Sequence, residues 1–335
     1  MPSNRCTYPF AAGLSLVQSN HMEISVVLPV YNEKEVVIPL YRALRSSLDR
    51  LAEDYEIIFV DDGSVDGTVP EMLNMAKSDP HVIIVELTRN FGNAMAIAIG
   101  LEFASGEWVV TMDSDFEDKP EDIGELYKKA REGYDVVYAV RESTQKSFLK
   151  DIGSRAFYFL MSRISSIPLP PNMGNFCIMR QDVVRALRKM SERTRYFAGI
   201  RSWVGFAQVG IDLPRGKRLA GRPKQSFPRL IKQALDAMFS FSTVPLRLLT
   251  LLGTLAILFA LLVAVLIVVW RLTRPEVRVE WALTIIAIFF VGGIQLIGLG
   301  ILGAYLGRIY DEVRGRPVAI IKKLTNAKAG LRVES

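Results

Sequence analysis

Two long runs of uncharged, mostly apolar residues limit what this chain can fold into more than any other feature. Residues 248–270 and 281–307 contain no Asp, Glu, Lys or Arg. A helix of about 20 apolar residues crosses the hydrocarbon core of a bilayer, so both runs are long enough. A pair of buried core helices is the alternative, but core helices of this length nearly always carry a polar stripe. The sequence therefore predicts two transmembrane helices.

The segments that flank the two runs predict the orientation of the chain. Arginines lie in the loop 271–280, but more basic residues precede the first run and follow the second. Because basic loops favour the cytoplasmic side, we expect an integral protein of the plasma (inner) membrane with its soluble part and both termini in the cytoplasm. The predicted division is a disordered leader (1–21), a globular domain (22–228), an interfacial amphipathic helix (229–245), two transmembrane helices (246–307, about 248–270 and 281–307) and a basic cytoplasmic tail (308–335).

Cysteine, histidine and charge composition exclude several classes of site. The chain has two Cys and two His, and no CxxC pair, which argues against a disulfide scaffold, a zinc site and a Ser-His-Asp mechanism. The formal net charge is +6, a modest excess that suits a membrane surface. We expect a membrane partner and no nucleic-acid partner.

From residue 22 onward the globular part alternates between two patterns. Short β-branched runs alternate with amphipathic stretches of helical length, which is typical of βαβ units around a mainly parallel sheet. The predicted strands are 24–30, 56–60, 82–87, 108–112 and 136–140, and the predicted helices are 35–52, 66–77, 92–104 and 120–132. Ligands of such sheets bind beyond the carboxyl ends of the strands. The predicted fold class is α/β and Rossmann-like, followed by the two transmembrane helices.

Acidic turns follow three of the predicted strands. Asp113 and Asp115 come directly after a buried strand, and two carboxylates with this spacing can chelate a hard divalent ion such as Mg²⁺ or Mn²⁺. Asp61 and Asp62 end the second strand, where they can contact a nucleobase or ribose, and Glu33 follows the first strand. No Walker A or GxGxxG loop accompanies these turns. Phosphates would therefore be held by metal and by Lys or Arg side chains.

The motifs along the chain resemble those of family 2 glycosyltransferases of the GT-A fold. More narrowly, they are similar to polyprenyl-phosphate glycosyltransferases, a group that includes dolichol-phosphate mannose synthases and bactoprenol glucosyltransferases. The motifs are VVLPVYNE (26–33), FVDDGSVDGT (59–68), LTRNFGNAMAIAIGL (87–101), MDSDFEDKPED (112–122), PPNMGNF (170–176), RLAGRPKQSF (218–227), FSTVPLRLL (241–249) and LGAYLGRIYDEVRGRP (302–317). The resemblance implies metal-dependent, inverting transfer of a hexose from a nucleotide sugar (UDP- or GDP-hexose) to a polyprenyl phosphate, undecaprenyl or dolichyl, at the cytoplasmic membrane face.

The resemblance also implies roles for single residues. The nucleotide sugar would be held by Pro29, Tyr31, Glu33, Asp61, Asp62 and Asp113. The metal would be held by Asp113, Asp115 and Glu117, where Glu117 replaces the Gln that is common in the family. The catalytic set would comprise Asp115, Asn175, Arg218 and Lys224. Arg218 and Lys224 would lie near the donor or lipid phosphate.

Asn175 departs from the family pattern, in which an Asp at this position is often proposed as the general base. An amide accepts no proton at neutral pH. A phosphate monoester has a second pKa of about 6, so the acceptor is already largely dianionic and needs little deprotonation. Alignment and neutralisation of the leaving diphosphate would then carry catalysis.

Other functions remain as alternatives. A membrane-bound transferase that extends a polysaccharide or glycolipid is the second hypothesis. Such an enzyme would need a longer transmembrane channel and usually has a QxxRW motif, and the sequence shows neither. A non-catalytic membrane scaffold is the third reading. The glycines of the second apolar run suit helix packing within the chain, while the resemblance favours a homo-oligomer. The sequence does not identify the sugar.

Overall fold

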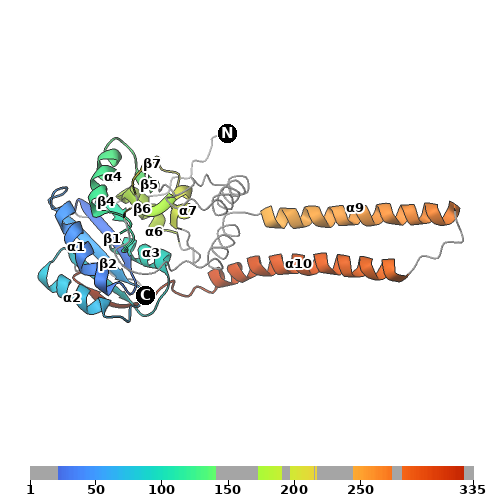
Figure 1. Ribbon diagram of the computed structural model, residues 1–335, viewed down its shortest axis with the longest axis horizontal. Coiled ribbons are helices and arrows are strands. Elements are labelled where there is room, and N and C mark those ends of the chain that lie inside the picture. The colour runs from blue at the N-terminus through green and yellow to red at the C-terminus, as the bar shows by residue number, and fades with distance from the viewer. Residues whose placement is uncertain are drawn as a thin grey trace, which may run out of the picture.

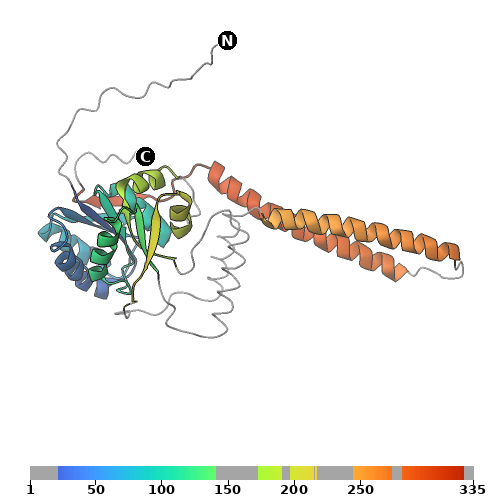
Figure 2. The same cartoon turned by 90° about the horizontal axis from the view of Figure 1, so that it is seen from above.

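A computed structural model describes residues 22–140, 173–190, 197–214, 216, 244–273 and 281–327. The described residues form a globular α/β domain, from which two long helices extend side by side (Figure 1, Figure 2). The predicted leader (1–21) and interfacial helix (229–245) lie outside the described residues, apart from positions 244 and 245.

The described part of the domain is built on one mixed sheet of eight strands, in the order β7-β5-β6-β4-β1-β2-β3-β8. The strands are β1 (Ile24–Val30), β2 (Tyr55–Asp61), β3 (Val82–Leu87), β4 (Trp108–Thr111), β5 (Val136–Val140), β6 (Met173–Arg180), β7 (Gln208–Asp212) and β8 (Ile321–Thr325). The neighbours β4, β1, β2 and β3 are parallel, and β5 is parallel to β7. Strand β6 is antiparallel to β4 and β5, and β8 is antiparallel to β3. The predicted α/β architecture with a parallel centre is confirmed.

Helices cover both faces of the sheet because alternate strand residues point to opposite sides. One face packs against α1 (Lys34–Leu48), α2 (Thr68–Ser78), the 3-10 turn η1 (Pro120–Asp122) and α4 (Ile123–Ala130). The other packs against α3 (Asn93–Phe103), α6 (Gln181–Arg188) and α7 (Phe197–Trp203). In β1, for example, Val26 faces the first layer and Val27 the second. Since both faces are buried, the central strands are continuous apolar runs.

Helix α3 approaches the sheet closely through Gly100. A Cβ atom at this position would lie 2.3 Å from Val27 Cγ1 and 2.9 Å from Val60 Cγ2. Only glycine therefore lets the helix pack at this distance. The helix thus packs on β1 and β2, and Asn93 at its start lies beside Asp113, which follows β4.

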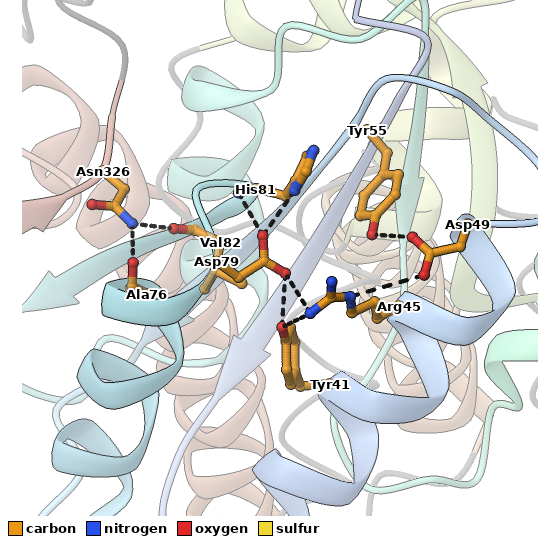
Figure 3. Close-up of polar contacts among 9 residues, drawn as sticks. All are labelled: Tyr41, Arg45, Asp49, Tyr55, Ala76, Asp79, His81, Val82 and Asn326. Carbon is orange, nitrogen blue, oxygen red and sulfur yellow. Dashed lines mark hydrogen bonds and ion pairs between the residues drawn. The ribbon is translucent and has the colours of Figure 1, made fainter.

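The C-terminal segment differs from the prediction. The sequence predicts a basic tail over 308–335, whereas α10 continues to Val313 and residues 321–325 form β8 on the edge of the central sheet. Ile321 and Leu324 pack against the apolar layer beside α3, and Lys322 forms an ion pair with Glu86 at 4.0 Å. The strand satisfies backbone groups of β3 that would otherwise form an open edge. The Asn326 side-chain amide then donates to carbonyls at the end of α2 and the start of β3 (Figure 3).

The predicted membrane spans fall on α9 (Val244–Thr273) and α10 (Trp281–Val313). The two helices contact each other, and Leu249 of α9 packs against Gly298 of α10. Within the described residues, one helical segment, Phe290–Val313, is long and apolar enough to cross a membrane, and Leu249–Val263 of α9 is a shorter apolar segment. Both membrane spans stay predictions.

Candidate functional site

The acidic turns predicted from the sequence lie at one edge of the sheet. Strands β4, β1, β2 and β3 run in parallel, so the segments that follow them meet where the strands end. Backbone bonds link these ends: Asp62 N donates to Val30 O at 2.8 Å and Met112 N donates to Val27 O at 3.2 Å. The turns that carry Glu33, Asp62 and Asp113 are thus neighbours in space.

The turn after β1 is locked to the turn after β2. Asn32 has a left-handed backbone (φ 54°), its N–H donates to Ser64 Oγ at 2.9 Å and its Oδ1 accepts from Val65 N at 2.9 Å. Glu33 N donates to Thr68 Oγ1 at 3.0 Å. Non-glycine residues with a left-handed backbone are uncommon, and they are found preferentially at binding sites.

Three of the predicted donor-binding residues lie next to the hydrogen bonds that join these two turns. Tyr31 is 36% exposed and Glu33 is half-buried, so both can present their side chains at the rim. Pro29 lies buried within β1, two residues before the strand turns outward. The part of Pro29 in donor binding stays a prediction.

Asp61 and Asp62 are both nearly fully buried and bind backbone N–H groups. Asp61 accepts from Gly63 N and Ser64 N at 3.2 Å, and Asp62 accepts from Phe91 N at 2.6 Å and Gly92 N at 2.9 Å. Burial raises the pKa of both carboxyls, and these hydrogen bonds partly oppose the shift. The two carboxylates thus hold the loops that form the site.

The loop between β3 and α3 is a part of the site that the sequence interpretation missed. Gly63 touches it so closely that a Cβ would lie 2.6 Å from the Arg89 carbonyl carbon. Arg89 itself is exposed, and its guanidinium carbon lies 4.3 Å from the centroid of the Phe91 ring. Burial raises the pKa of Asp62, and the charge of Arg89 is one of the interactions that oppose this rise. The motif LTRNFGNA (87–94) could have indicated this loop as part of the site, because an Arg and a Gly follow a strand end there.

Asp113 is held between two amides. Its Oδ1 accepts from Asn93 Nδ2 at 3.0 Å and from Asn175 Nδ2 at 3.2 Å, and no hydrogen bond from the described residues reaches Oδ2. Asn93 begins α3 and Asn175 lies on β6, where its carbonyl accepts from Thr111 Oγ1 at 2.6 Å. The structure therefore places two of the predicted site residues, Asp113 and Asn175, in direct contact, and Asn93 is a further partner of Asp113.

The segment after Asp113 turns sharply. Phe116 has a left-handed backbone (φ 63°), and Glu117 N donates to Asp115 Oδ1 at 3.1 Å. Within the part of the chain that is described, no three His, Cys, Asp or Glu side chains form a group that could hold a metal ion. The metal-binding role of Asp113, Asp115 and Glu117 therefore stays a prediction.

The start of the basic stretch that follows β7 lies against this turn. Gly216 N donates to Glu117 O at 2.9 Å, and a Cβ on Gly216 would lie 2.9 Å from Phe116 O. The predicted catalytic residues Arg218 and Lys224 come next in the chain but lie outside the described residues.

A polar network at the opposite, amino-terminal edge of the sheet has a structural character (Figure 3). Asp79 is 2% exposed and accepts from Tyr41 Oη at 2.7 Å and from the backbone and ring nitrogens of His81 at 2.9 and 2.8 Å. Burial on its own would raise the pKa of Asp79, but these hydrogen bonds lower it below its usual value. An open pocket of about 620 Å³ lies beside the network, far from the acidic turns.

Comparisons with known proteins identify the family of this chain. A model of the family described as "Glycosyl transferase family 2" matches residues 25–188. A glycosyltransferase of Synechocystis sp. is 40% identical over 304 residues, which cover 90% of this chain and 96% of the relative. The bactoprenol glucosyl transferase of Shigella phage SfII is 37% identical over 303 residues, which cover 90% of this chain and 98% of the relative.

Among solved structures, glucosyl-3-phosphoglycerate synthase from Mycobacterium tuberculosis superposes with a TM-score of 0.44 at 21% identity. The match covers 65% of this chain and 76% of that chain. The full-length relatives carry the assignment, because they extend through both long helices as well as the sheet. This chain therefore belongs to glycosyltransferase family 2 and is a glycosyltransferase of the group that includes the bactoprenol glucosyl transferases.

Proposed function

We propose that this enzyme transfers a hexose from a nucleotide sugar, UDP- or GDP-hexose, to a polyprenyl phosphate at the cytoplasmic face of the membrane, with inversion at the anomeric carbon. One observation carries the proposal: Asp113 is clamped between Asn93 and Asn175 at the edge where the acidic turns meet. The similarity to bactoprenol glucosyl transferases over 90% of the chain supports the choice of acceptor.

The donor nucleotide would bind across the ends of β1 and β2. Tyr31 and Glu33 at the rim are the proposed contacts for the base and ribose, above Pro29. Asp61 and Asp62 would support the donor site indirectly by holding its loops in place, because their carboxylates already accept hydrogen bonds from backbone N–H groups of two loops. Exposed Arg89 lies beside these loops and supplies a positive charge for the diphosphate.

The acidic turn after β4 fits a divalent cation, Mg²⁺ or Mn²⁺. Such ions are bound by one or two carboxylates together with substrate phosphates and water, so three protein carboxylates are unnecessary. Asp113 and Asp115 would hold the ion, with Glu117 as a further oxygen ligand, and Asp113 Oδ2 is not engaged by the described residues. When bound, the ion neutralises charge on the leaving diphosphate.

The acceptor phosphate would approach from the side of β6. Its oxygen forms a bond to the anomeric carbon while the bond between that carbon and the donor diphosphate breaks, which inverts the configuration. Asn175 orients Asp113 through its amide instead of removing a proton, since the phosphate is already deprotonated. Arg218 and Lys224, which follow Gly216 in the chain, are the proposed partners of the donor or lipid phosphate.

The position of β8 supports the proposed topology. β8 pairs with β3, so the chain after α10 returns to the sheet that it left before α9. If both helices span the membrane, they must cross it twice and leave the catalytic domain on one side. The pairing of β8 with β3 does not depend on the charges in the connecting loops, and the basic residues that flank the helices favour the cytoplasm as that side.

The function is tested with the full-length protein in nanodiscs. Undecaprenyl phosphate, Mn²⁺ or Mg²⁺ and a panel of labelled UDP- and GDP-hexoses are supplied, and label is measured in the organic phase. Lipid-extractable label in monosaccharide form, with the anomeric configuration inverted by NMR, is the expected result. A long polymer would instead support a processive synthase, and absence of label with every donor would overturn the proposal.

A further inference from the structure

Arg201 of α7 is the largest side chain that is completely buried in the described residues. Its guanidinium carbon lies 5.0 Å from the centroid of the Tyr138 ring and 5.9 Å from that of Phe197. Its Nη1 donates to the carbonyl of Gly174 at 3.3 Å. The carbonyl of Arg201 in turn accepts from Gln208 Nε2 at 2.7 Å, which fixes the end of α7 to β7.

The other edge of this guanidinium has no partner. Nε and Nη2 form no hydrogen bond with any of the described residues, although both atoms are inaccessible to solvent. These two nitrogens form the fork that pairs with two oxygens of a carboxylate or phosphate. A buried guanidinium with two unsatisfied nitrogens is costly, and an apolar side chain would stabilise the fold better. The charge therefore points to a role in function.

Arg188 of α6 shows how the same fold satisfies a structural arginine. Its Nε donates to Leu101 O at 2.8 Å, and its Nη2 donates to Leu101 O and Ala104 O at 2.5 Å. This guanidinium caps the carboxyl end of α3, and the same two atoms that lack partners in Arg201 are both used. Arg188 is thus a matched control for a buried arginine with a purely structural role.

A short chain of contacts connects Arg201 to the reaction site. Gly174, whose carbonyl binds Arg201, directly precedes Asn175 on β6. Asn175 is held through its carbonyl by Thr111 and donates its amide to Asp113 at 3.2 Å. The position of the Asn175 amide, and with it the orientation of Asp113, therefore depends on the segment that Arg201 binds.

We infer that Arg201 is a positioning residue for the acceptor side of the site: it holds the Gly174–Asn175 segment and places a positive charge behind it for a phosphate monoester. The inference rests on the proposed function, because it takes the acceptor to be a lipid phosphate. Arg201 makes no direct contact with the substrate. It acts through Asn175 and through its field, which is strong where water is excluded.

Steady-state kinetics of the full-length enzyme test this role, with the donor and undecaprenyl phosphate varied in turn. Arg201→Met removes the charge at similar volume, Arg201→Lys keeps a charge without the fork, and Arg188→Met is the control. We expect Arg201→Met to lower kcat/KM for the lipid phosphate about 10- to 100-fold, the effect of losing a hydrogen bond to a charged group, with little change in the donor KM. The kcat/KM of Arg201→Lys for the lipid phosphate should lie between those of Arg201→Met and the unaltered enzyme. Arg188→Met should change neither this kcat/KM nor the donor KM.

The inference is overturned if Arg201→Met leaves the acceptor kcat/KM unchanged. It is also overturned if both Met variants lower the parameters of donor and acceptor in parallel, because that pattern reports folding alone. Should Arg201→Met fail to fold, Arg201→Lys is compared with Arg188→Lys, and only the former should weaken use of the acceptor. Equal effects of the two Lys variants would contradict the assignment.

Binding of a short-chain polyprenyl phosphate without donor, followed by tryptophan fluorescence, separates this inference from the proposed function. If the unaltered protein transfers no sugar to lipid, the proposed function fails. Loss of lipid-phosphate binding in Arg201→Met but not in Arg188→Met would still support the role of Arg201. Equal binding by both variants, or no binding by the unaltered protein, overturns it.

Discussion

Replacing Asp62 by Asn or Ala tests whether this carboxylate organises the donor side of the site. In the structure it accepts Phe91 N at 2.6 Å and Gly92 N at 2.9 Å, and it is 3% exposed. An Asn side chain offers one acceptor oxygen, so one of these bonds is lost. An Ala side chain leaves both N–H groups buried without a partner.

The size of each effect follows from opposing contributions. Losing one bond to a charged group costs about 1.5–3 kcal/mol, and leaving two buried N–H groups unpaired costs about 2–6 kcal/mol. Burial raises the pKa of Asp62, which means that the charged form is itself disfavoured, and Asn removes that penalty. We therefore expect Asp62→Asn to cost less than about 3 kcal/mol and Asp62→Ala to cost more than Asn. With about 2–4 °C per kcal/mol for a domain of this size, the Ala variant should melt about 4–24 °C lower.

The assay combines thermal unfolding in detergent, followed by intrinsic fluorescence, with the KM for the donor sugar nucleotide. Because Asp62 holds residues 91 and 92, both variants should also raise the donor KM, by about tenfold for each 1.4 kcal/mol of lost binding. Asp54→Asn, an exposed acid at the opposite edge of the sheet, is the matched control and should change neither quantity. If both Asp62 variants melt and bind donor like the unaltered enzyme, the carboxylate does not organise the loop and the reasoning is refuted.

Three further predictions concern other carboxyl and amide groups. Asp115→Ala should abolish transfer of label to lipid while the melting temperature stays close to that of the unaltered protein. Glu121→Ala, at an exposed position, is the control. Full residual activity of Asp115→Ala would contradict the proposed metal role. Asn175→Asp places a second carboxylate 3.2 Å from Asp113 and should lower kcat, whereas a rise by orders of magnitude would show that the reaction needs a base. The pKa of Asp79 is lowered in the folded protein, so its stabilising contribution is present above the ordinary Asp range and is lost as pH falls through the folded pKa. Asp79→Asn should therefore melt lower than the unaltered protein at pH 7, with a difference that shrinks in acid.

Much of the fold and part of the site followed from local patterns. The strand Ile24–Val30 was predicted with its observed bounds, because a β-branched run that is buried on both faces is recognisable from seven residues. Asp113 and Asn175 were both identified, through a strand end and a motif. Their direct contact was not predicted, because the two residues are 62 positions apart and meet only where β4 pairs with β6.

Other features had no local signal. β8 was interpreted as part of a basic tail, because a strand of five residues with two lysines is recognisable only beside the edge that it pairs with. The role of Asp62 as a backbone clamp depends on residues 91 and 92, about 30 positions away. Arg201 lies among the aromatic and apolar residues of 196–206, where nothing in the sequence distinguishes it, since its burial and its unsatisfied nitrogens are properties of the folded protein.

Composition and order along the chain were enough to predict the α/β class, two long apolar helices and acidic turns at strand ends, because periodicity and charge act over a few residues. Three-dimensional pairing decided which loop each carboxylate holds, that the C-terminal strand returns to the catalytic sheet, and that the apolar runs are two helices lying side by side. It also placed the buried charge of Arg201 beside Gly174, the neighbour of Asn175. These outcomes depend on contacts between distant residues, whose geometry is set by packing of the whole domain.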